Sequence, residues 1–249
     1  MGQQRPAYAW QTDKGLVRTH NEDAVAVYSD AGLVIVADGI GGANAGDVAS
    51  RLATEVIGAC FRERPPPPRD RKEALRRVKA AVEEANRVVW EASQRTSRYV
   101  GMGTTLVLGF VGPDWLVFGH VGDSRIYRLR DGDLTQVTRD HSLIQEVVDG
   151  GLFPTLEDAR RSGINEHVLT RALGTGDSVV VDMREMDLVP GDLFLFCTDG
   201  LTGMVSDEDL RRTLLIADQD LDRLPAMLVN LALEGGGLDN ITVALMRVC

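Results

Sequence analysis

The chain has 249 residues, of which 44% are hydrophobic, and a net charge of −10 from 37 acidic and 27 basic residues. This length suits one large domain or two small ones, and the acidic balance disfavours nucleic acid as a partner because it repels the phosphate backbone. The absence of any run of about eighteen apolar residues excludes a transmembrane helix and predicts no membrane partner.

The N-terminus and the cysteines indicate a cytoplasmic protein. The first six residues contain no apolar signal core, and Pro6 stands where a myristoylation signal needs Ser or Thr. Cys60, Cys197 and Cys249 are too widely spaced for a disulfide framework or a zinc knuckle. The cytoplasm is therefore the expected compartment.

The first part of the chain predicts strands followed by two helices. Apolar residues at helical spacing predict amphipathic helices over residues 45–61 and about 71–93. Between these helices, residues 64–69 contain four consecutive prolines and predict a stiff surface connection. The strands expected before the first helix cover residues 8–12, 24–28 and 33–37.

After residue 100 the pattern changes to short strands separated by Gly-Pro-Asp, Gly-Asp and Asp-Gly turns, which favour antiparallel hairpins. Helices are expected over residues 141–149 and 225–233, and an irregular polar stretch over 150–165. Ser206 and Asp209 have the spacing of a helix cap. The strands expected here cover residues 104–111, 115–121, 125–129, 134–138, 179–186, 193–197 and 241–248. This order predicts one α+β domain of antiparallel sheets covered by helices.

Carboxylates stand where several of the predicted strands begin or end. Four apolar runs adjoin an aspartate beside a glycine or asparagine, and the pair Glu22-Asp23 directly precedes a strand. A single Asp-Gly is commonly only a turn, as we expect at Asp131-Gly132. The four aspartates of the pattern are Asp38, Asp123, Asp199 and Asp239.

Taken together, these carboxylates predict a site for divalent cations. Converging on one rim, they would repel one another by about 4 kcal/mol per close pair at an effective dielectric constant near 20, unless protons or cations neutralised them. Oxygen ligands without histidine or thiolate suit Mg²⁺ or Mn²⁺ better than zinc, and several bridging aspartates suit two metals that turn water into hydroxide. Arg18, four residues before Glu22, could hold a phosphate by two parallel hydrogen bonds.

Other phosphate chemistries lack their motifs. There is neither a P-loop nor a Gly-x-Ser-x-Gly elbow. A cysteine phosphatase needs an arginine six positions after its cysteine, but Pro66 and Gly203 stand at those positions after Cys60 and Cys197. Metal-ligand spacing is also absent among the four histidines, which are His20, His120, His141 and His167.

Eight segments between residues 12 and 242 resemble, in order, those of the PPM family, the type 2C metal-dependent protein serine/threonine phosphatases, and particularly its compact bacterial members. The segments are Thr12-Asp13-x-Gly15-x-x-Arg18-x-x-Asn21-Glu22-Asp23, Val36-Ala-Asp38-Gly39-x-Gly41-Gly42, Gly101-Met-Gly103-Thr104-Thr105, Gly122-Asp123-Ser124-Arg125, Asp140-His141-Ser142, Thr170-Arg-Ala-Leu-Gly174, Thr198-Asp199-Gly200-Leu201 and Asp239-Asn240-Ile-Thr242.

The resemblance implies a fold and a set of roles. The fold is a four-layer αββα arrangement, a sandwich of two antiparallel sheets with helices outside each, in a single domain over residues 1–249 with a mobile flap at about 143–168. Two or three Mn²⁺ or Mg²⁺ ions are implied as cofactors. The implied ligands are Asp38, Asp199 and Asp239 for the first ion, Glu22, Asp38 and the carbonyl of Gly39 for the second, and Asp123 with Asp199 for a weaker third.

The implied reaction is hydrolysis of phosphoserine and phosphothreonine in proteins, by in-line attack of a metal-bridging hydroxide and without a phosphoenzyme. Arg18 would bind the phosphate, and Asp23 would hold metal-bound water by hydrogen bonds. Animal members place a histidine directly after the Asp-Gly, where this chain has Ile40. The general acid is therefore open between His20 and a metal-bound water.

The family also implies partners, and two other functions stay open. Phosphoserine and phosphothreonine proteins would be the substrates, and a serine/threonine kinase acting on the same targets in bacterial signalling is the expected counterpart. The alternatives are a catalytically inactive metal-binding scaffold and a dimetal phosphatase of small phosphate esters.

Overall fold

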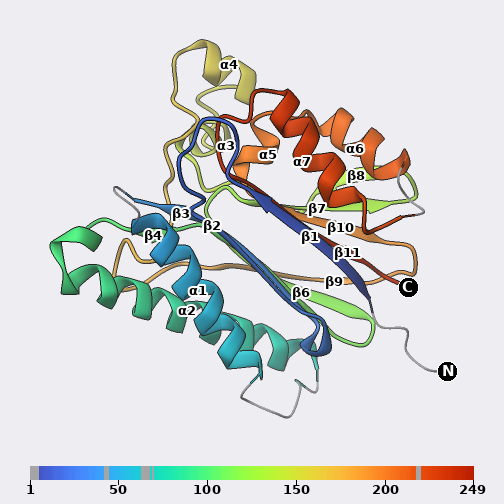
Figure 1. Ribbon diagram of the computed structural model, residues 1–249, viewed down its shortest axis with the longest axis horizontal. Helices are drawn as coiled ribbons and strands as arrows, with labels where there is room; N and C mark the ends of the chain where they lie inside the picture. The colour runs from blue at the N-terminus through green and yellow to red at the C-terminus, as the bar shows by residue number, and fades with distance from the viewer. Residues whose placement is uncertain (1–5, 42–44, 63–67, 69, 217–219) are drawn as a thin grey trace.

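Two antiparallel β-sheets lie face to face, with helices on the outer side of each sheet (Figure 1). The computed structural model describes residues 6–41, 45–62, 68, 70–216 and 220–249. The predictions made for residues 1–5, and for the proline segment apart from Pro68, therefore lie outside the described residues. The predicted α+β class and the αββα layering are confirmed.

The first sheet joins strands from both ends of the chain. Its order is β1 (Ala7–Asp13), β11 (Ile241–Arg247), β10 (Leu193–Cys197), β7 (Arg125–Arg130) and β8 (Asp133–Gln136). In this sheet Asp13 pairs with Ile241, so the N-terminal and C-terminal strands end and begin at the same edge.

The second sheet is built mainly of consecutive hairpins. Its order is β2 (Asp23–Tyr28), β3 (Leu33–Ile40), β5 (Leu106–Val111), β6 (Trp115–Val121) and β9 (Asp182–Asp187), with β4 (Gly103–Thr104) paired to the end of β3. Asp23 pairs with Asp38, which places the start of β2 beside the end of β3.

Side-chain alternation along β3 explains why this strand is apolar almost throughout. Val34 and Val36 point into the space between the two sheets, and Leu33, Ile35 and Ala37 point to the helices on the other side. A strand that is buried on both faces has no polar alternation.

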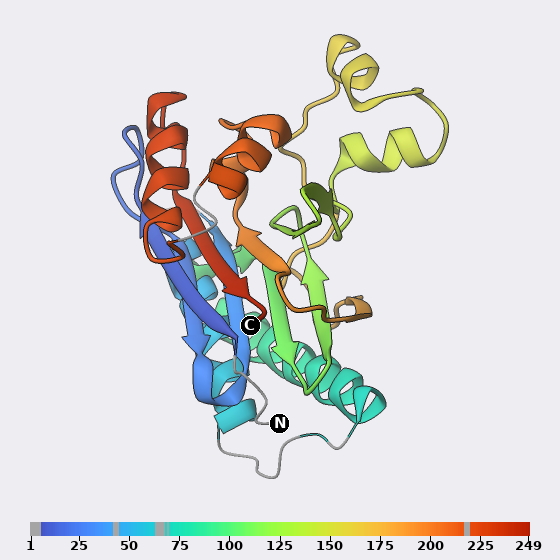
Figure 2. The same cartoon turned by 90° about the vertical axis from the view of Figure 1, so that its right-hand side faces the viewer.

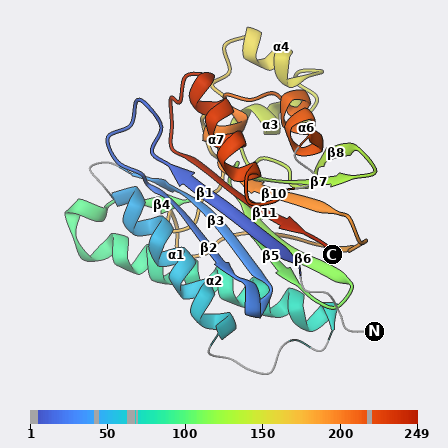
Figure 3. The same cartoon turned by 45° about the vertical axis from the view of Figure 1, so that its right-hand side comes forward.

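Each sheet is covered by helices on one face (Figures 1 and 3). Helices α1 (Ala45–Arg62) and α2 (Arg71–Arg95) pack on the second sheet. The first sheet is covered by α5 (Asp199–Thr202), α6 (Asp207–Ile216) and α7 (Leu224–Glu234). Two short 3-10 helices cover Ser29–Ala31 and Ser97–Tyr99. Within the part of the chain that the structure describes, every helix is too short or too polar to cross a membrane.

Two further helices, α3 (Leu143–Asp149) and α4 (Leu156–Arg161), project beyond one end of the sandwich (Figure 2). The prediction of an irregular stretch over residues 150–165 is thus wrong, because these residues include α4. The local signal was a helix cap: Thr155 Oγ1 accepts the Asp158 N–H at 3.1 Å. The Ser206 cap of α6 was predicted and is confirmed, since Ser206 Oγ accepts the Asp209 N–H at 3.2 Å.

Predicted strand bounds differ from the structure mainly at the ends. The strands predicted over 115–121 and 193–197 are confirmed to the residue. The strand expected over 104–111 is interrupted at Thr105, whose N–H donates to the Asp38 carbonyl at 2.8 Å. The strand expected from residue 179 begins only at Asp182.

Candidate functional site

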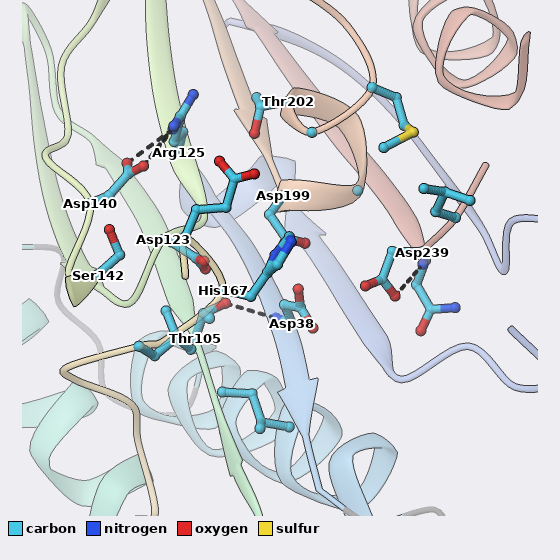
Figure 4. A pocket seen from close by; sticks show the side chains of 18 of the residues that line it. Asp38, Thr105, Asp123, Arg125, Asp140, Ser142, His167, Asp199, Thr202 and Asp239 are labelled. Carbon is cyan, nitrogen blue, oxygen red and sulfur yellow. Dashed lines mark hydrogen bonds and ion pairs between the residues drawn. The ribbon is translucent and has the colours of Figure 1, made fainter. Parts of the chain in front are cut away.

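The predicted metal-binding carboxylates meet at one end of the sandwich. Glu22, Asp38, Asp123, Asp199 and Asp239 line one cavity of about 1000 Å³ (Figure 4). Both sheets contribute to it, because strands β2, β3 and β6 and strands β10 and β11 all begin or end at this edge. Antiparallel pairing thereby brings together residues that lie far apart in the sequence.

Burial and mutual repulsion hold protons on these carboxyl groups. Burial raises the pKa of Asp38 well above its usual value, and the charges of four neighbouring aspartates raise it further. Burial raises the pKa of Asp23 to about 7, although a hydrogen bond from Thr198 Oγ1, 2.9 Å from Asp23 Oδ2, opposes the rise. Burial also raises the pKa of Asp123 to about 7.

The residues at this end fit a group of divalent cations. Oδ1 of Asp23 and Oδ1 of Asp199 are buried and have no hydrogen-bond partner among the described residues. Buried oxygens of this kind normally have a partner, and carboxylates that repel one another are stabilised by positive charge. The donors are oxygens throughout, as Mg²⁺ and Mn²⁺ prefer.

Arg18 borders the same cavity and pairs with one of the carboxylates. Its Nη2 donates to Asp239 Oδ2 at 2.7 Å, and this hydrogen bond raises the pKa of the guanidinium. The Arg18 side chain is 53% exposed, so part of its donor set faces solvent. A guanidinium in this position can receive a phosphate that enters the cavity.

Two of the glycines that follow aspartates are required by close backbone packing. A Cβ on Gly39 would lie 2.1 Å from the Gly46 carbonyl oxygen, and a Cβ on Gly200 would lie 1.9 Å from the Asn240 carbonyl oxygen. By contrast, Gly132 has a φ of 84° and open space around it, which confirms the predicted turn at Asp131-Gly132. The Asp-Gly pairs at the cavity thus need glycine for close packing, whereas Asp131-Gly132 forms a turn.

Asn240 joins the loop that carries Arg18 to the start of β11, a role that sequence reasoning missed. Its Oδ1 accepts the Glu22 N–H at 2.8 Å, and its Nδ2 donates to the carbonyls of Lys14 and His20 at 2.9 Å each. The Asp239-Asn240 pair was the signal, because an amide can satisfy donors and acceptors of two backbones at once.

The histidine predicted as a general acid is not among the described residues that line the cavity. His20 is exposed, and its Nδ1 lies 2.9 Å from Thr19 Oγ1. Ile40 and His167 do line the cavity, and Figure 4 shows the His167 ring among the aspartates. The proximity of His167 also lowers the pKa of Asp199, against the larger rise from burial.

Two other histidines come together outside the cavity, which their sequence spacing did not predict. The rings of His120 and His141 stack with centroids 4.4 Å apart, and ligand atoms of these two and Asp182 lie within 4.8 Å of one another. The Gly122 N–H donates to His141 Nδ1 at 3.0 Å, so neutral His141 carries its proton on Nε2, 3.2 Å from Asp182 Oδ2. A protonated Nε2 has no lone pair for a metal, so we interpret this group as a polar contact.

Comparisons with known proteins identify the family of this chain. The family model for Protein phosphatase 2C matches residues 16–224. The chain is 38% identical over 241 residues to the Serine/threonine protein phosphatase PstP of Mycobacterium tuberculosis, a match that covers 97% of this chain and 45% of that protein. It is 35% identical over 241 residues to the Serine/threonine phosphatase stp of Listeria monocytogenes, covering 96% and 94%. The chain belongs to the protein phosphatase 2C family.

A solved structure supports the same assignment at the level of the fold. The catalytic domain of the serine/threonine protein phosphatase PstP, in complex with two manganese ions, matches with a TM-score of 0.85 and 36% identity over 97% of both chains. The predicted family and fold are confirmed. The chain spans less than half the length of the Mycobacterium tuberculosis relative that it matches.

Proposed function

We propose that this chain removes phosphate from phosphoserine and phosphothreonine in proteins, with two or three Mn²⁺ or Mg²⁺ ions bound at the acidic cavity. The observation that carries the proposal is the cavity itself, in which five carboxylates from both sheets surround one space with Arg18 at its edge. Manganese in the matched PstP structure supports the choice of metal.

The proposed ligands follow the positions of the carboxylates. When bound, the ions would supply a nucleophile from water at neutral pH and neutralise charge on the phosphate. We assign them as in the sequence prediction: Asp38, Asp199 and Asp239 to the first ion, Glu22, Asp38 and the Gly39 carbonyl to the second, and Asp123 with Asp199 to the third.

The remaining roles belong to side chains around these ligands. Arg18 would orient the phosphate by two parallel hydrogen bonds, exchanging its contact with Asp239 for the substrate. Asp23, which pairs with Asp38 across the two strands, would accept hydrogen bonds from water held by the ions. Thr198 holds the Asp23 carboxylate in place through the hydrogen bond to Oδ2.

Partners and place of action complete the proposal. We infer that the substrates are phosphoproteins that a serine/threonine kinase also modifies in bacterial signalling. Nothing in the net charge of −10 favours nucleic acid as a ligand. The three free thiols, two of them buried, suit the cytoplasm. We further propose that residues 1–249 act as one phosphatase domain, with residues 143–168 as a flap beside the cavity.

The test is phosphate release from a phosphothreonine peptide with EDTA, Mg²⁺ or Mn²⁺. Asp199→Asn removes a cavity carboxylate, and Asp131→Asn is the matched control at the β7–β8 turn. We expect metal-dependent release that falls about 10³-fold in Asp199→Asn and is retained in Asp131→Asn.

Two other results would contradict the proposal. Folded protein that releases no phosphate with any metal would favour the inactive scaffold. Release from p-nitrophenyl phosphate but from no phosphopeptide would favour a phosphatase of small esters.

A further inference from the structure

Two apolar side chains that line the cavity, Met204 and Leu238, and two that directly precede Arg18 in the chain, Leu16 and Val17, form what we call the apolar rim. Three of them are largely exposed, Leu16 by 66%, Val17 by 62% and Leu238 by 55%. Met204 and Leu238 line the cavity itself. Exposed apolar side chains that gather at the edge of a site commonly mark a contact surface.

Three members of the rim, Leu16, Met204 and Leu238, are brought together because the loop before Arg18 packs on the loop before Asp239. The Leu16 N–H donates to the Gly237 carbonyl at 2.8 Å, and Leu16 Cγ lies 3.0 Å from where a Gly237 Cβ would be. Leu238 Cδ2 and Met204 Sδ both lie 3.8 Å from where a Gly236 Cβ would be. Because Gly236 and Gly237 have no side chains, these apolar side chains can pack directly on their backbone.

The opposite side of the cavity has a different character. There the segment with α3 and α4 contributes the ion pair between Arg160 and Glu166, 2.6 Å apart, and the imidazole of His167, besides the apolar side chains of Ile144, Leu156 and Leu169. In Figure 2 the loop after β1 and this segment stand on opposite sides of the same end of the sandwich. A peptide that crosses the cavity would contact an exposed apolar rim on one side and a mixture of ion-paired, polar and apolar groups on the other.

We propose that the apolar rim is a specificity surface that binds a large apolar side chain of the phosphoprotein, close to the phosphorylated residue. The proposal rests on the proposed function, because it places the phosphate beside Arg18, the residue that follows Val17. Covering the exposed rim removes apolar surface from water, which favours binding. Glu22 and Asp239, which line the same side, would repel an acidic residue there.

The test is a set of phosphothreonine peptides in which one leucine is moved through the three positions on either side of the phosphothreonine. In each peptide the leucine is compared with serine and with aspartate. With Mn²⁺, we expect wild-type protein to prefer leucine over serine about five- to tenfold in kcat/KM at one or two positions, and to disfavour aspartate most.

The variant Leu16→Ser/Val17→Ser should reduce this preference to within about twofold. The matched control is Val100→Ser/Val180→Ser, which changes two side chains that are 71% and 68% exposed and lie outside the apolar rim, after α2 and before β9. This control should keep the preference. All three proteins should hydrolyse p-nitrophenyl phosphate with kcat/KM values within about twofold, because this substrate has no side chain to contact the rim.

The outcomes separate this proposal from the proposed function. Phosphopeptide hydrolysis without a leucine preference, or with the same preference in Leu16→Ser/Val17→Ser, would overturn the specificity surface and leave the phosphatase intact. So would a dimer in light scattering that the rim variant dissociates, because the rim would then join two copies. No metal-dependent hydrolysis of any substrate would overturn both.

Discussion

The guanidinium of Arg18 and the carboxylate of Asp239 hold each other at the edge of the acidic cavity, with Nη2 2.7 Å from Oδ2, although they are 221 residues apart in sequence. One is the proposed phosphate ligand and the other a proposed metal ligand. Each therefore compensates the charge of the other when neither ligand is bound. Because of this pair, substituting Arg18 should lower activity on the substrate and strengthen binding of the metal.

Arg18→Gln should lower kcat/KM on a phosphothreonine peptide about 10²-fold, because a bidentate phosphate contact is lost. Mn²⁺ should bind the variant up to about fivefold more tightly, since the exposed ion pair no longer competes for Asp239. Isothermal calorimetry measures the second effect without turnover. The matched control is Arg139→Gln, which removes a similarly exposed ion pair with Asp149; weaker Mn²⁺ binding by Arg18→Gln would contradict the competition.

The metal-free protein should lose stability as the pH rises from 6.5 to 8. Burial raises the pKa of Asp23 and of Asp123 to about 7 from an ordinary value near 4, so the folded state binds more protons than the unfolded state in this range. A melting temperature lower by about 5 °C at pH 8 is expected in EDTA. His120 acts in the opposite direction as the pH falls below about 6.5, because burial lowers its pKa to about 4 in the folded state and the unfolded state then binds more protons.

Saturating Mn²⁺ should raise the melting temperature at pH 8 and reduce this loss, because the ions neutralise the carboxylates. Thermal unfolding followed by circular dichroism at pH 6.5 and 8, with EDTA or Mn²⁺, checks both effects. A metal-free melting temperature that is unchanged or rises over this range would contradict the protonated cluster.

Two aspartates should respond to neutralisation with opposite signs. Asp38→Asn should raise the melting temperature of the metal-free protein by about 3 °C, because the amide is neutral at no cost, whereas the buried Asp38 carboxyl must either take up a proton or be repelled by four other aspartates. Asp140→Asn should lower it by about 5 °C, because Asp140 accepts hydrogen bonds from Arg125 Nε at 3.0 Å and Nη2 at 2.6 Å. Unfolding in EDTA measures both, and a fall for Asp38→Asn would show that its charge is already compensated.

Asn240→Ala should destabilise the protein by about 2 kcal/mol and weaken Mn²⁺ binding about tenfold, because three backbone hydrogen bonds to the loop around Arg18 are lost. Asn86→Ala is a matched control, since Asn86 also bonds two backbone groups, Gly174 N–H and Gly176 O, within the core. The control should lose similar stability in urea unfolding and keep its Mn²⁺ affinity. Equal Mn²⁺ affinity in both variants would remove the organising role of Asn240.

The general acid can be tested by comparing leaving groups. If a histidine protonates the serine alkoxide, replacing it should slow hydrolysis of phosphoserine about 10²-fold. Hydrolysis of p-nitrophenyl phosphate should change little, because its leaving group needs no proton. Because His167 lines the cavity and His20 does not, His167→Ala should show this difference and His20→Ala should not. A selective loss in His20→Ala would instead restore the role predicted from the sequence, and equal effects on both substrates would exclude both histidines.

Much of the fold was readable in the sequence because local physics decides it. The strand over residues 115–121 was predicted to its bounds, because a short apolar run between two turns favours a buried strand. The cap spacing of Ser206 and Asp209 predicted the start of α6. Helix α4 was not predicted, because Pro154 and Gly163 are strong local signals for a loop and the cap at Thr155 is followed by a helix of only 6 residues.

The candidate metal ligands could be identified without the structure, because Asp38, Asp199 and Asp239 adjoin apolar runs that must become buried strands. How these carboxylates meet depends on the way in which the strands pair. Pairing of β1 with β11 brings Arg18 to Asp239. Gly39 and Gly200 pack closely against backbone, and this distinguishes their Asp-Gly pairs from an ordinary turn. Local patterns constrain one strand at a time, whereas distances between side chains of different strands depend on the register of whole sheets.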